Sequence, residues 1–279
     1  MNTVIFSDVH LNVAEDGRDL MEKFTAFLSA IDPASTNRIV ILGDLFDFWF
    51  EYKHVIFSGY FNVLRAFADL SDAGVEIHFV IGNHDFWAGR FLRQHLRFQI
   101  HEDLTLDLNG KRALFIHGDG INPGDSNYRL YKRIARSPII VRLFGLIHPD
   151  WAMGLAQGVS RGSRHMKKVD DLSQGAEVAP LREFARAALV EGRADIVFCG
   201  HSHYPVMETF PTPGGEGLYI NTGDWLYHQS YIEWDGTTFH QRSVIAEPHR
   251  EEIPERHAQR RPNEPQQEPQ NAGAPFARE

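Results

Sequence analysis

Five apolar segments of the chain each end in polar residues that commonly bind metal ions. The segments are VIFSDVH (4–10), IVILGD (39–44), HFVIGNHD (78–85), ALFIHGD (113–119) and IVFCGHSH (196–203). Their runs of Val, Ile, Leu and Phe predict buried strands. Because functional groups gather beyond the carboxyl ends of strands in open α/β sheets, we expect the residues that end these runs to meet at one edge.

The residues expected at that edge form a set of metal ligands. They are Asp8, His10, Asp44, Asn83, His84, His117, His201 and His203. A mixture of carboxylate, amide and imidazole donors without a thiolate suits divalent cations such as Mn²⁺, Fe²⁺ or Zn²⁺. Asp44 is the predicted bridge, because the two oxygens of one carboxylate can contact two cations about 3.5–4 Å apart. The sequence therefore predicts a dinuclear metal centre.

The spacing within these segments supports that hypothesis. Asp8 and His10, like His201 and His203, stand two residues apart, and extended backbone points such side chains to one face. Glycines stand where the chain must turn and where its backbone must pass close to an ion, at Gly43, Gly82, Gly118 and Gly200. Each motif alone is more often a turn, but five in order favour a metal centre over chance.

The ordered motifs resemble those of the calcineurin-like metallophosphoesterases over about residues 3–246. The matching residues are Asp8-x-His10, Gly43-Asp44, Gly82-Asn83-His84-Asp85, His117-Gly118-Asp119 and Gly200-His201-x-His203. The resemblance implies that one metal is bound by Asp8, His10, Asp44 and His203. It implies that the other is bound by Asp44, Asn83, His117 and His201. Because every ligand position is filled, a metal-bound scaffold without turnover is the weakest of the hypotheses.

The same resemblance implies that Asn83, His84 and Asp85 are catalytic residues. His84 would face the phosphate, as an electrostatic stabiliser or as the proton donor to the leaving oxygen. Asp85 would orient the imidazole of His84. Asn83 would stabilise the phosphoryl oxygens together with a metal.

Other segments resemble a narrower group, the UDP-2,3-diacylglucosamine hydrolases of lipid A synthesis. These segments are GDLFDFW (43–49), EYK (51–53), HGDGINPGDSNYRLYK (117–132), HPDWAMGLAQGVSRGSR (148–164) and NTGDW (221–225). The resemblance implies cleavage of a pyrophosphate to UMP and a diacylglucosamine 1-phosphate. It also implies a helical lid that covers the acyl chains.

The segment between Asp119 and Asp195, which separates the His-Gly-Asp motif from the Gly-His-x-His motif, has room for such a lid. Its part 139–156 is unusually apolar, and a cluster of basic residues follows it. An apolar slot beside cationic groups suits a phosphorylated lipid or an anionic membrane surface, although a hairpin packed on its own domain and a solvated basic face are the alternatives. The resemblance to these hydrolases implies that Asp125, Tyr128, Arg129, Arg161 and Ser163 bind the substrate. Arg164 and Lys167, from the basic cluster, complete the predicted substrate-binding residues.

The remaining pattern predicts helices and hairpins around these strands. Helices are expected at 19–31, 57–73, 88–95, 127–136, 139–146 and 179–191, and hairpin turns at Asn109-Gly110 and Asp235-Gly236. The predicted fold is of the α/β class. With the family resemblance, it is a metallophosphoesterase-type sandwich of two mixed β-sheets flanked by helices, with a helical lid insertion. The expected organisation is a core at 1–120 and 194–246, a lid at 121–193 and a disordered tail at 247–279.

Composition limits the possible partners and location. The formal net charge of −9 argues against a nucleic-acid-binding surface. Cys199 is the only cysteine, so no intrachain disulfide can form, which fits a reducing cytoplasm. Neither a secretion signal nor an apolar run of membrane-spanning length is present in the sequence. We therefore expect a cytoplasmic protein whose contact with the cytoplasmic face of the inner membrane is peripheral.

The leading hypothesis is a hydrolase that uses two divalent cations, expected to be Mn²⁺, to cleave UDP-2,3-diacylglucosamine, a nucleotide-sugar lipid. The alternative is a metallophosphoesterase for another phosphodiester or phosphomonoester, such as a nucleotide or a phosphoprotein. A metal centre recognises only phosphate, so it does not distinguish these substrates. The lid is the feature that does, because binding of acyl chains makes activity depend on the lipid.

Overall fold

The computed structural model describes residues 1–124, 126–155, 158 and 175–245. Contacts divide the chain into a unit Met1–Ala246 and a unit Glu247–Glu279, and all described residues belong to the first unit. The prediction of a disordered tail at 247–279 therefore falls outside the described residues. Within the described part of the chain, no helix is both long enough and apolar enough to cross a bilayer.

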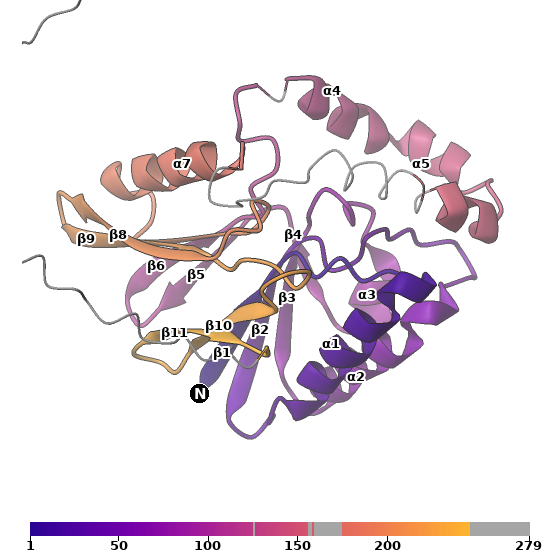
Figure 1. Cartoon of the computed structure of the whole chain (residues 1–279), viewed down its shortest axis with the longest axis horizontal. Coiled ribbons are helices and arrows are strands. Elements are labelled where there is room, and N and C mark those ends of the chain that lie inside the picture. The colour runs from indigo at the N-terminus through magenta and orange to yellow at the C-terminus, as the bar shows by residue number, and fades with distance from the viewer. Residues whose placement is uncertain (125, 156–157, 159–174, 246–279) are drawn as a thin grey trace, which may run out of the picture. The chain divides into compact units, whose positions relative to one another are not determined.

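Two mixed sheets form the centre of the first unit (Figure 1). The strands of the first sheet lie in the order β11 (Phe239–Ser243), β10 (Ser230–Trp234), β1 (Asn2–Phe6), β2 (Thr36–Leu42), β3 (Glu76–Val80) and β4 (Gln99–His101). Strands β1 to β4 are parallel, whereas β10 and β11 are antiparallel to their neighbours. The four parallel strands therefore direct their carboxyl ends to the same edge.

The second sheet also combines parallel and antiparallel strands. Its order is β5 (Leu104–Leu108), β6 (Lys111–Phe115), β7 (Ile196–Cys199), β9 (Gly215–Asn221) and β8 (Val206–Thr212). Strands β6, β7 and β9 are parallel, and β5 and β8 pair antiparallel at the two edges. The two mixed sheets confirm the predicted fold class. The predicted hairpin turns are also confirmed, between β5 and β6 and between β10 and β11.

The side chains between the sheets explain why they stack. Ile5, Val40 and Val80 of the first sheet share one buried cluster with Phe115 and Phe198 of the second. The rings of Phe115 and Phe198 stack with centroids 4.5 Å apart. Each fully buried side chain of this size contributes about 1.5–3 kcal/mol to the free energy of unfolding. Alternate residues of β1 and β2 point instead to a second cluster beneath the helices.

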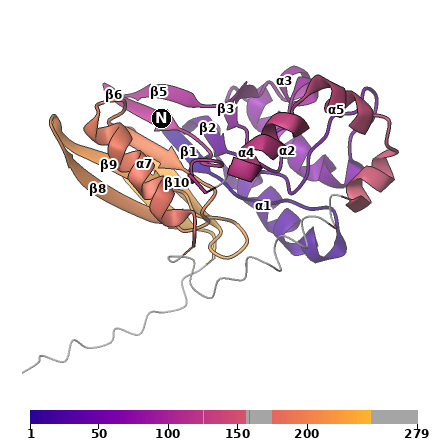
Figure 2. The same ribbon diagram turned by 90° about the horizontal axis from the view of Figure 1, so that it is seen from above.

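Helices cover the outer faces of both sheets (Figures 1 and 2). The helices next to the first sheet are α1 (Arg18–Ala30), α2 (Phe61–Asp72) and α3 (Arg90–His95), with short 3-10 turns η1 (Glu15–Gly17) and η2 (Ser58–Tyr60) before α1 and α2. Helix α7 (Val178–Val190) packs on the second sheet through Leu181, Ala185 and Leu189. It was expected within the lid, but its packing makes it part of the outer layer of that sheet.

Two further helices, α4 (Ser126–Ala135) and α5 (Pro138–Phe144), follow the His-Gly-Asp segment. Pro138 occupies the first turn of α5, where its missing N–H group costs no hydrogen bond. The ring of Phe144 in α5 packs against Phe50 and Trp87, with centroids 4.9 and 4.8 Å away. Aromatic contacts therefore join α5 to the loops that follow β2 and β3.

Candidate metal centre

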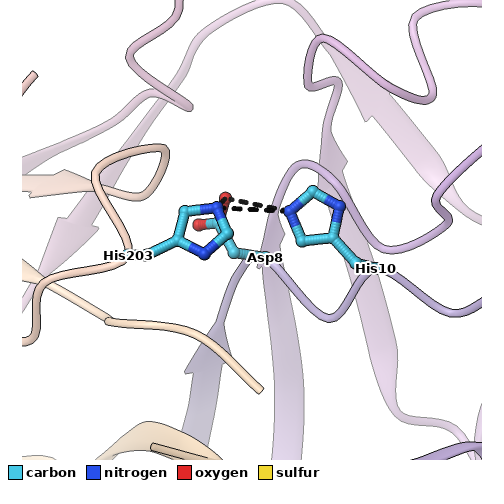
Figure 3. A group of neighbouring side chains, drawn as sticks. All are labelled: Asp8, His10 and His203. Carbon is cyan, nitrogen blue, oxygen red and sulfur yellow. Dashed lines mark hydrogen bonds and ion pairs between the residues drawn. The ribbon is translucent and has the colours of Figure 1, made fainter. Parts of the chain in front are cut away.

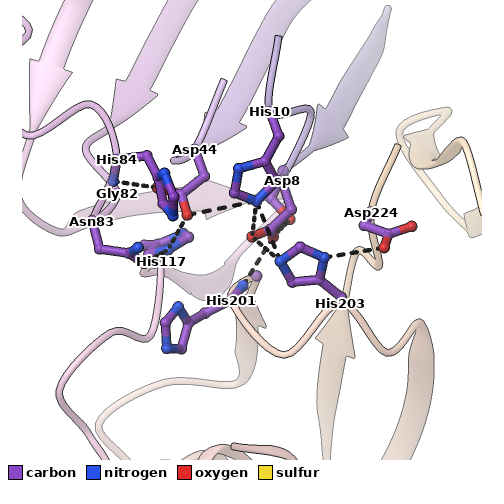
Figure 4. A network of polar contacts seen from close by, with 12 residues as sticks. Asp8, His10, Asp44, Gly82, Asn83, His84, His117, His201, His203 and Asp224 are labelled. Carbon is purple, nitrogen blue, oxygen red and sulfur yellow. Dashed lines mark hydrogen bonds and ion pairs between the residues drawn. The ribbon is translucent and has the colours of Figure 1, made fainter. Parts of the chain in front are cut away.

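The predicted ligands follow the carboxyl ends of five strands (Figure 4). Three of these strands, β1, β2 and β3, belong to the first sheet, and β6 and β7 belong to the second. The structure brings the side chains at their ends together in three overlapping groups with metal-binding geometry, Asp8–His10–His203, His10–Asp44–His84 and Asp44–His117–His201. The edges of two sheets thus meet at one cluster.

The first group joins the beginning of the chain to the end of β7 (Figure 3). Nε2 of His203 lies 3.4 Å from Oδ1 of Asp8, and Nε2 of His10 lies 3.8 Å from the same oxygen. The two Nε2 atoms of His10 and His203 are 3.3 Å apart. Three potential ligand atoms therefore converge from two loops, one after β1 and one after β7.

The third group, Asp44–His117–His201, lies around Asp44 and His117. Nε2 of His117 is 3.4 Å from Oδ2 of Asp44 and 3.0 Å from Oδ1 of Asn83. Oδ2 of Asp44 is also 3.8 Å from Nε2 of His10, a residue of the first group. Asp44 consequently lies between the two groups, the position that a bridging carboxylate requires.

The backbone at this cluster has an unusual conformation. Five of the predicted ligands have left-handed φ values, 52° at Asp8, 52° at His10, 51° at Asp44, 65° at His201 and 60° at His203. A residue with a Cβ atom that is held in this region costs about 1–3 kcal/mol of conformational energy. The expectation that extended backbone pairs these side chains was wrong, because two left-handed residues separated by one other produce the convergence.

Glycines provide the space into which the ligands fit. A Cβ atom on Gly200 would lie 2.6 Å from Oδ2 of Asp8, and one on Gly43 would lie 2.6 Å from Nδ1 of His117. A Cβ atom on Gly82 would collide with Oδ1 of Asp44. The close approach expected from the sequence therefore involves backbone and ligand side chains.

The chemistry of the cluster fits divalent cations. Asp8 is fully buried, and its Oδ1 has no hydrogen-bond partner among the described residues. A buried carboxylate oxygen without a partner is costly unless a cation compensates it. Oxygen and imidazole donors together suit a hard or borderline divalent ion. The donor set thus fits the two-metal centre that the sequence predicted.

Hydrogen bonds behind the cluster orient the imidazoles. Nδ1 of His117 lies 2.7 Å from the carbonyl oxygen of Leu42, and Nδ1 of His203 lies 3.1 Å from Oδ2 of Asp224. Donation from Nδ1 leaves Nε2 as the free acceptor that a metal needs. Asp224 also accepts from His228, whose Nδ1 is 3.1 Å from Oδ1. Sequence reasoning did not assign Asp224 a role, although the NTGDW segment was a signal.

The assignment of Asp85 needs correction. The hydrogen-bond partner of Nδ1 of His84 is the backbone carbonyl oxygen of Asp47, 2.9 Å away, and not the carboxylate of Asp85. The buried carboxylate of Asp85 accepts the N–H groups of Gly82 and Leu45 at 2.9 and 2.8 Å. Asp85 therefore fixes the two loops, while Asp47 orients the imidazole of His84. The two roles cannot be separated from sequence, because Asp85 is adjacent to His84.

Burial and charge shift the acidities within the cluster in opposite directions. Burial by itself lowers the pKa of His117, but the adjacent carboxylate of Asp44 raises that pKa to about 10. Burial by itself raises the pKa of Asp44, but the charges of His117 and His84 hold it well below its ordinary value. Burial and the charge of Asp44 raise the pKa of Asp85 to about 7. In the metal-free cluster the proton is therefore on His117, which pairs with the carboxylate of Asp44.

The predicted substrate-binding residues of α4 interact with the loop that follows His117. The hydroxyl of Tyr128 donates to Oδ2 of Asp119 over 2.6 Å. The guanidinium of Arg129 donates to the carbonyl oxygens of Gly120 and Asn122. The other predicted substrate residues, Asp125, Arg161, Ser163, Arg164 and Lys167, lie outside the described residues.

Two sheets that present an Asp–His–Asn cluster at adjacent strand ends define a metal-dependent phosphoesterase. The family model for calcineurin-like phosphoesterases matches residues 1–205. The chain belongs to the calcineurin-like phosphoesterase family.

Curated relatives extend the similarity beyond the family model. A UDP-2,3-diacylglucosamine hydrolase of Porphyromonas gingivalis is 33% identical, over 83% of this chain and 93% of the relative. Proteins of the same name from Nitrosococcus oceani and Neisseria gonorrhoeae are 30% and 33% identical, over 89% and 84% of this chain and 97% and 95% of the relatives. A solved archaeal phosphodiesterase is similar over 87% of this chain and 99% of its own, at 13% identity and a TM-score of 0.43, too remote to bear on function.

Proposed function

We propose that this protein hydrolyses the pyrophosphate of UDP-2,3-diacylglucosamine to UMP and 2,3-diacylglucosamine 1-phosphate, a step of lipid A biosynthesis. The observation that carries the proposal is the similarity to hydrolases of this name over 83–89% of the chain, well past the residues that the family model matches. The cluster at the strand ends supplies donors suited to the chemistry. We assign two divalent cations to it, with Mn²⁺ as the working choice.

The proposed ligands are those that the sequence predicted, with Asp44 shared between Asp8, His10 and His203 on one side and Asn83, His117 and His201 on the other. When bound, two divalent cations neutralise charge on a phosphoryl group and make water a better nucleophile. Leu42 and Asp224 keep Nε2 of His117 and His203 directed at the cluster through hydrogen bonds to Nδ1.

His84 is proposed to act on the phosphate. Its Nδ1 lies on the carbonyl oxygen of Asp47, so Nε2 is the ring nitrogen left for an oxygen of the substrate. From there it can stabilise negative charge or donate a proton to the leaving oxygen. The side-chain amide of Asn83 is next to His117, with Oδ1 3.0 Å from Nε2 of the imidazole.

The exposed apolar surface of the insertion supports a lipid substrate. Among the described residues of this region, eight large apolar side chains are more than half exposed: Leu130, Tyr131, Ile134, Ile139, Leu143, Leu146, Trp151 and Leu155. Apolar patches of this kind are found where proteins meet lipids or partners. We propose that 121–193 contains the lid, that α4 and α5 contact the acyl chains, and that the same surface rests peripherally on the cytoplasmic face of the inner membrane.

The test is UMP release from UDP-2,3-diacylglucosamine by the Mn²⁺-loaded protein, with a generic aryl phosphodiester assayed in parallel. The proposal predicts fast cleavage of the lipid and slow cleavage of the aryl ester. Asp44→Asn should lower both rates at least about 100-fold together with the bound metal. Asp69→Asn, a control in α2 whose side chain is 70% exposed, should change neither. A slow lipid reaction beside a fast aryl reaction would assign another phosphoester to this metal centre.

A further inference from the structure

A cavity of about 210 Å³ lies beside the metal centre. His117 forms part of its wall, so a phosphate held by the cluster borders directly on this space. Pockets for drug-sized ligands measure about 300–1,000 Å³, so this cavity suits a fragment such as one ring, and it is too small for acyl chains. The mechanism proposed above leaves it without a role.

The two cations that line the cavity, Lys132 and Arg136, are both paired with carboxylates. Lys132 of α4 is paired with the carboxylate of Asp119, which is almost fully buried. Arg136 just beyond α4 is paired with Glu102, with Nη1 and Oε1 3.3 Å apart. Neither cation therefore offers a free positive charge to a second phosphate. With both cations paired and Asp103 as a further carboxylate in the wall, the cavity favours a polar ligand part that carries no negative charge.

The same groups retain unused hydrogen-bonding capacity. Arg136 has five N–H donors, and only Nη1 has an acceptor among the described residues. The ammonium group of Lys132 has three N–H donors, and among the described residues only Asp119 accepts a hydrogen bond from it. The carboxylate of Asp103 accepts no hydrogen bond from the described residues. Ile121 and Phe184 add apolar walls. The cavity thus offers donors and one acceptor between apolar surfaces.

We propose that this cavity binds the uracil ring of the substrate, an assignment that rests on the proposed function. Uracil is uncharged and flat, and it carries an N–H donor between two carbonyl acceptors. Asp103 accepts from that N–H group, and Arg136 and Lys132 donate to the carbonyl oxygens. The phosphate of UMP stays at the metal cluster, and the ribose connects it to the ring past His117.

Calorimetric titration of the Mn²⁺-loaded protein with UMP, CMP and ribose 5-phosphate tests this assignment. UMP should bind about tenfold or more tightly than ribose 5-phosphate, which has no base. CMP should bind more weakly than UMP, because cytosine places a lone pair where uracil has its N–H group. Asp103→Asn should reduce the preference for UMP over CMP, because an amide both donates and accepts.

Arg136→Met separates base recognition from phosphate binding. It should weaken UMP binding by about 10–100-fold while ribose 5-phosphate binds as before. Arg133→Met is the matched control, since Arg133 is exposed on α4, three residues before Arg136, and does not line the cavity. This control should leave the affinities for UMP and for ribose 5-phosphate unchanged.

Equal affinities for UMP and ribose 5-phosphate, or equal weakening of both by Arg136→Met, would overturn the uracil assignment. Normal release of UMP from the lipid substrate in that case would leave the proposed function standing. Absence of that release would overturn the proposed function itself, so the two failures are distinguishable.

Discussion

The ligand residues combine polar chemistry with strained backbone. Asp8, His10, Asp44, His201 and His203 all lie in the left-handed region, which side chains with a Cβ atom rarely occupy. Such conformations persist where the surrounding structure over-determines them, and they cluster at functional sites. Their concentration at one cluster is thus independent support for a functional role. The hydrogen bonds behind the cluster are the features that individual substitutions can test.

Asp224→Asn tests the orientation of His203. Burial by itself raises the pKa of Asp224, but hydrogen bonds from His203 and His228 hold that pKa well below its ordinary value, so the side chain is a carboxylate. Asparagine keeps the size but removes the charge that fixes the imidazole. We expect metal affinity and activity to fall about 10–100-fold. Metal content after dialysis at several free Mn²⁺ concentrations measures the first effect, and aryl ester hydrolysis measures the second.

The chain contains a matched control for this substitution. Asp235 accepts from Nε2 of His240 at 3.1 Å on the surface, an aspartate–histidine pair with no ligand role. Asp235→Asn should leave metal affinity and turnover unchanged. Equal effects of the two variants would show that loss of any such pair disturbs the protein, and the positioning role of Asp224 would be wrong.

At the scale of elements, apolar periodicity predicted most of the ligand-bearing architecture. The helix predicted at 19–31 is observed as Arg18–Ala30, and that at 179–191 as Val178–Val190. The strands before the ligands were predictable because both faces of β1, β2 and β7 are buried, which produces continuous apolar runs. Strand β4 has only three residues and exposed or half-buried positions, so no such signal marks it.

The sequence predicted which residues form the site better than it predicted their backbone conformations and hydrogen-bond partners. The residues that converge were identified from their order after strands. The left-handed conformations were not, because Asp and His adopt positive φ far less often than Gly does, so their presence alone does not predict it. The role of Asp47 was missed because its shortest contact with His84 is through its backbone carbonyl oxygen, at 2.9 Å, and its carboxylate is farther away, at 3.7 Å. Backbone partners depend on tertiary geometry, and a residue's type does not reveal them.

Strands β3 and β4 contain a histidine pair that predicts acid sensitivity. Nδ1 of His78 lies 3.2 Å from Nε2 of His101. Burial, and secondarily the charges of neighbouring groups, lower the pKa values of both. Glu76 and Arg38 face His78, and Arg93 is near His101. Because the unfolded chain binds protons more readily, the pair's contribution to stability is present above about pH 6.5 and is lost as pH falls below it.

His101→Gln tests this prediction, because it keeps a polar side chain and removes one titrating group. The urea midpoint of the variant should fall less between pH 8 and pH 5.5 than that of the unmodified protein. His54→Gln, at an exposed position, is the control and should retain the full pH dependence. The prediction is wrong if the urea midpoints of His101→Gln and His54→Gln depend on pH to the same extent.

At the scale of the whole molecule, the metal centre joins segments that are far apart in the sequence. Asp8 follows the first strand and His203 follows β7, yet Oδ1 of the former and Nε2 of the latter are 3.4 Å apart. The two ligand-bearing edges belong to different sheets, which are otherwise held together by the apolar cluster between them. Cations at the cluster therefore bind the folded state and not the unfolded chain. Metal binding should stabilise the whole described core.

Removal of metal tests this coupling. Treatment with a chelator should lower the free energy of unfolding, and free Mn²⁺ at 100 times its dissociation constant should restore about 2.7 kcal/mol for each site. The effect should depend on pH, because neutral imidazole binds metal and the raised pKa of His117, about 10, keeps it protonated in the metal-free protein. Metal uptake at pH 7 should therefore release protons, and affinity should rise about tenfold per pH unit for each proton displaced.

The sign of the stability change follows from the same pKa. The folded-state pKa of His117 lies above the value of 6.5 in the unfolded chain, so its contribution to the metal-free protein is complete below pH 6.5 and is lost as pH rises toward 10. The stability gap between metal-bound and metal-free protein should therefore widen over this range. Calorimetry in buffers of different ionisation enthalpy counts the released protons, and thermal unfolding with and without Mn²⁺ measures the gap. A constant gap together with no proton release would contradict a direct bond between metal and His117.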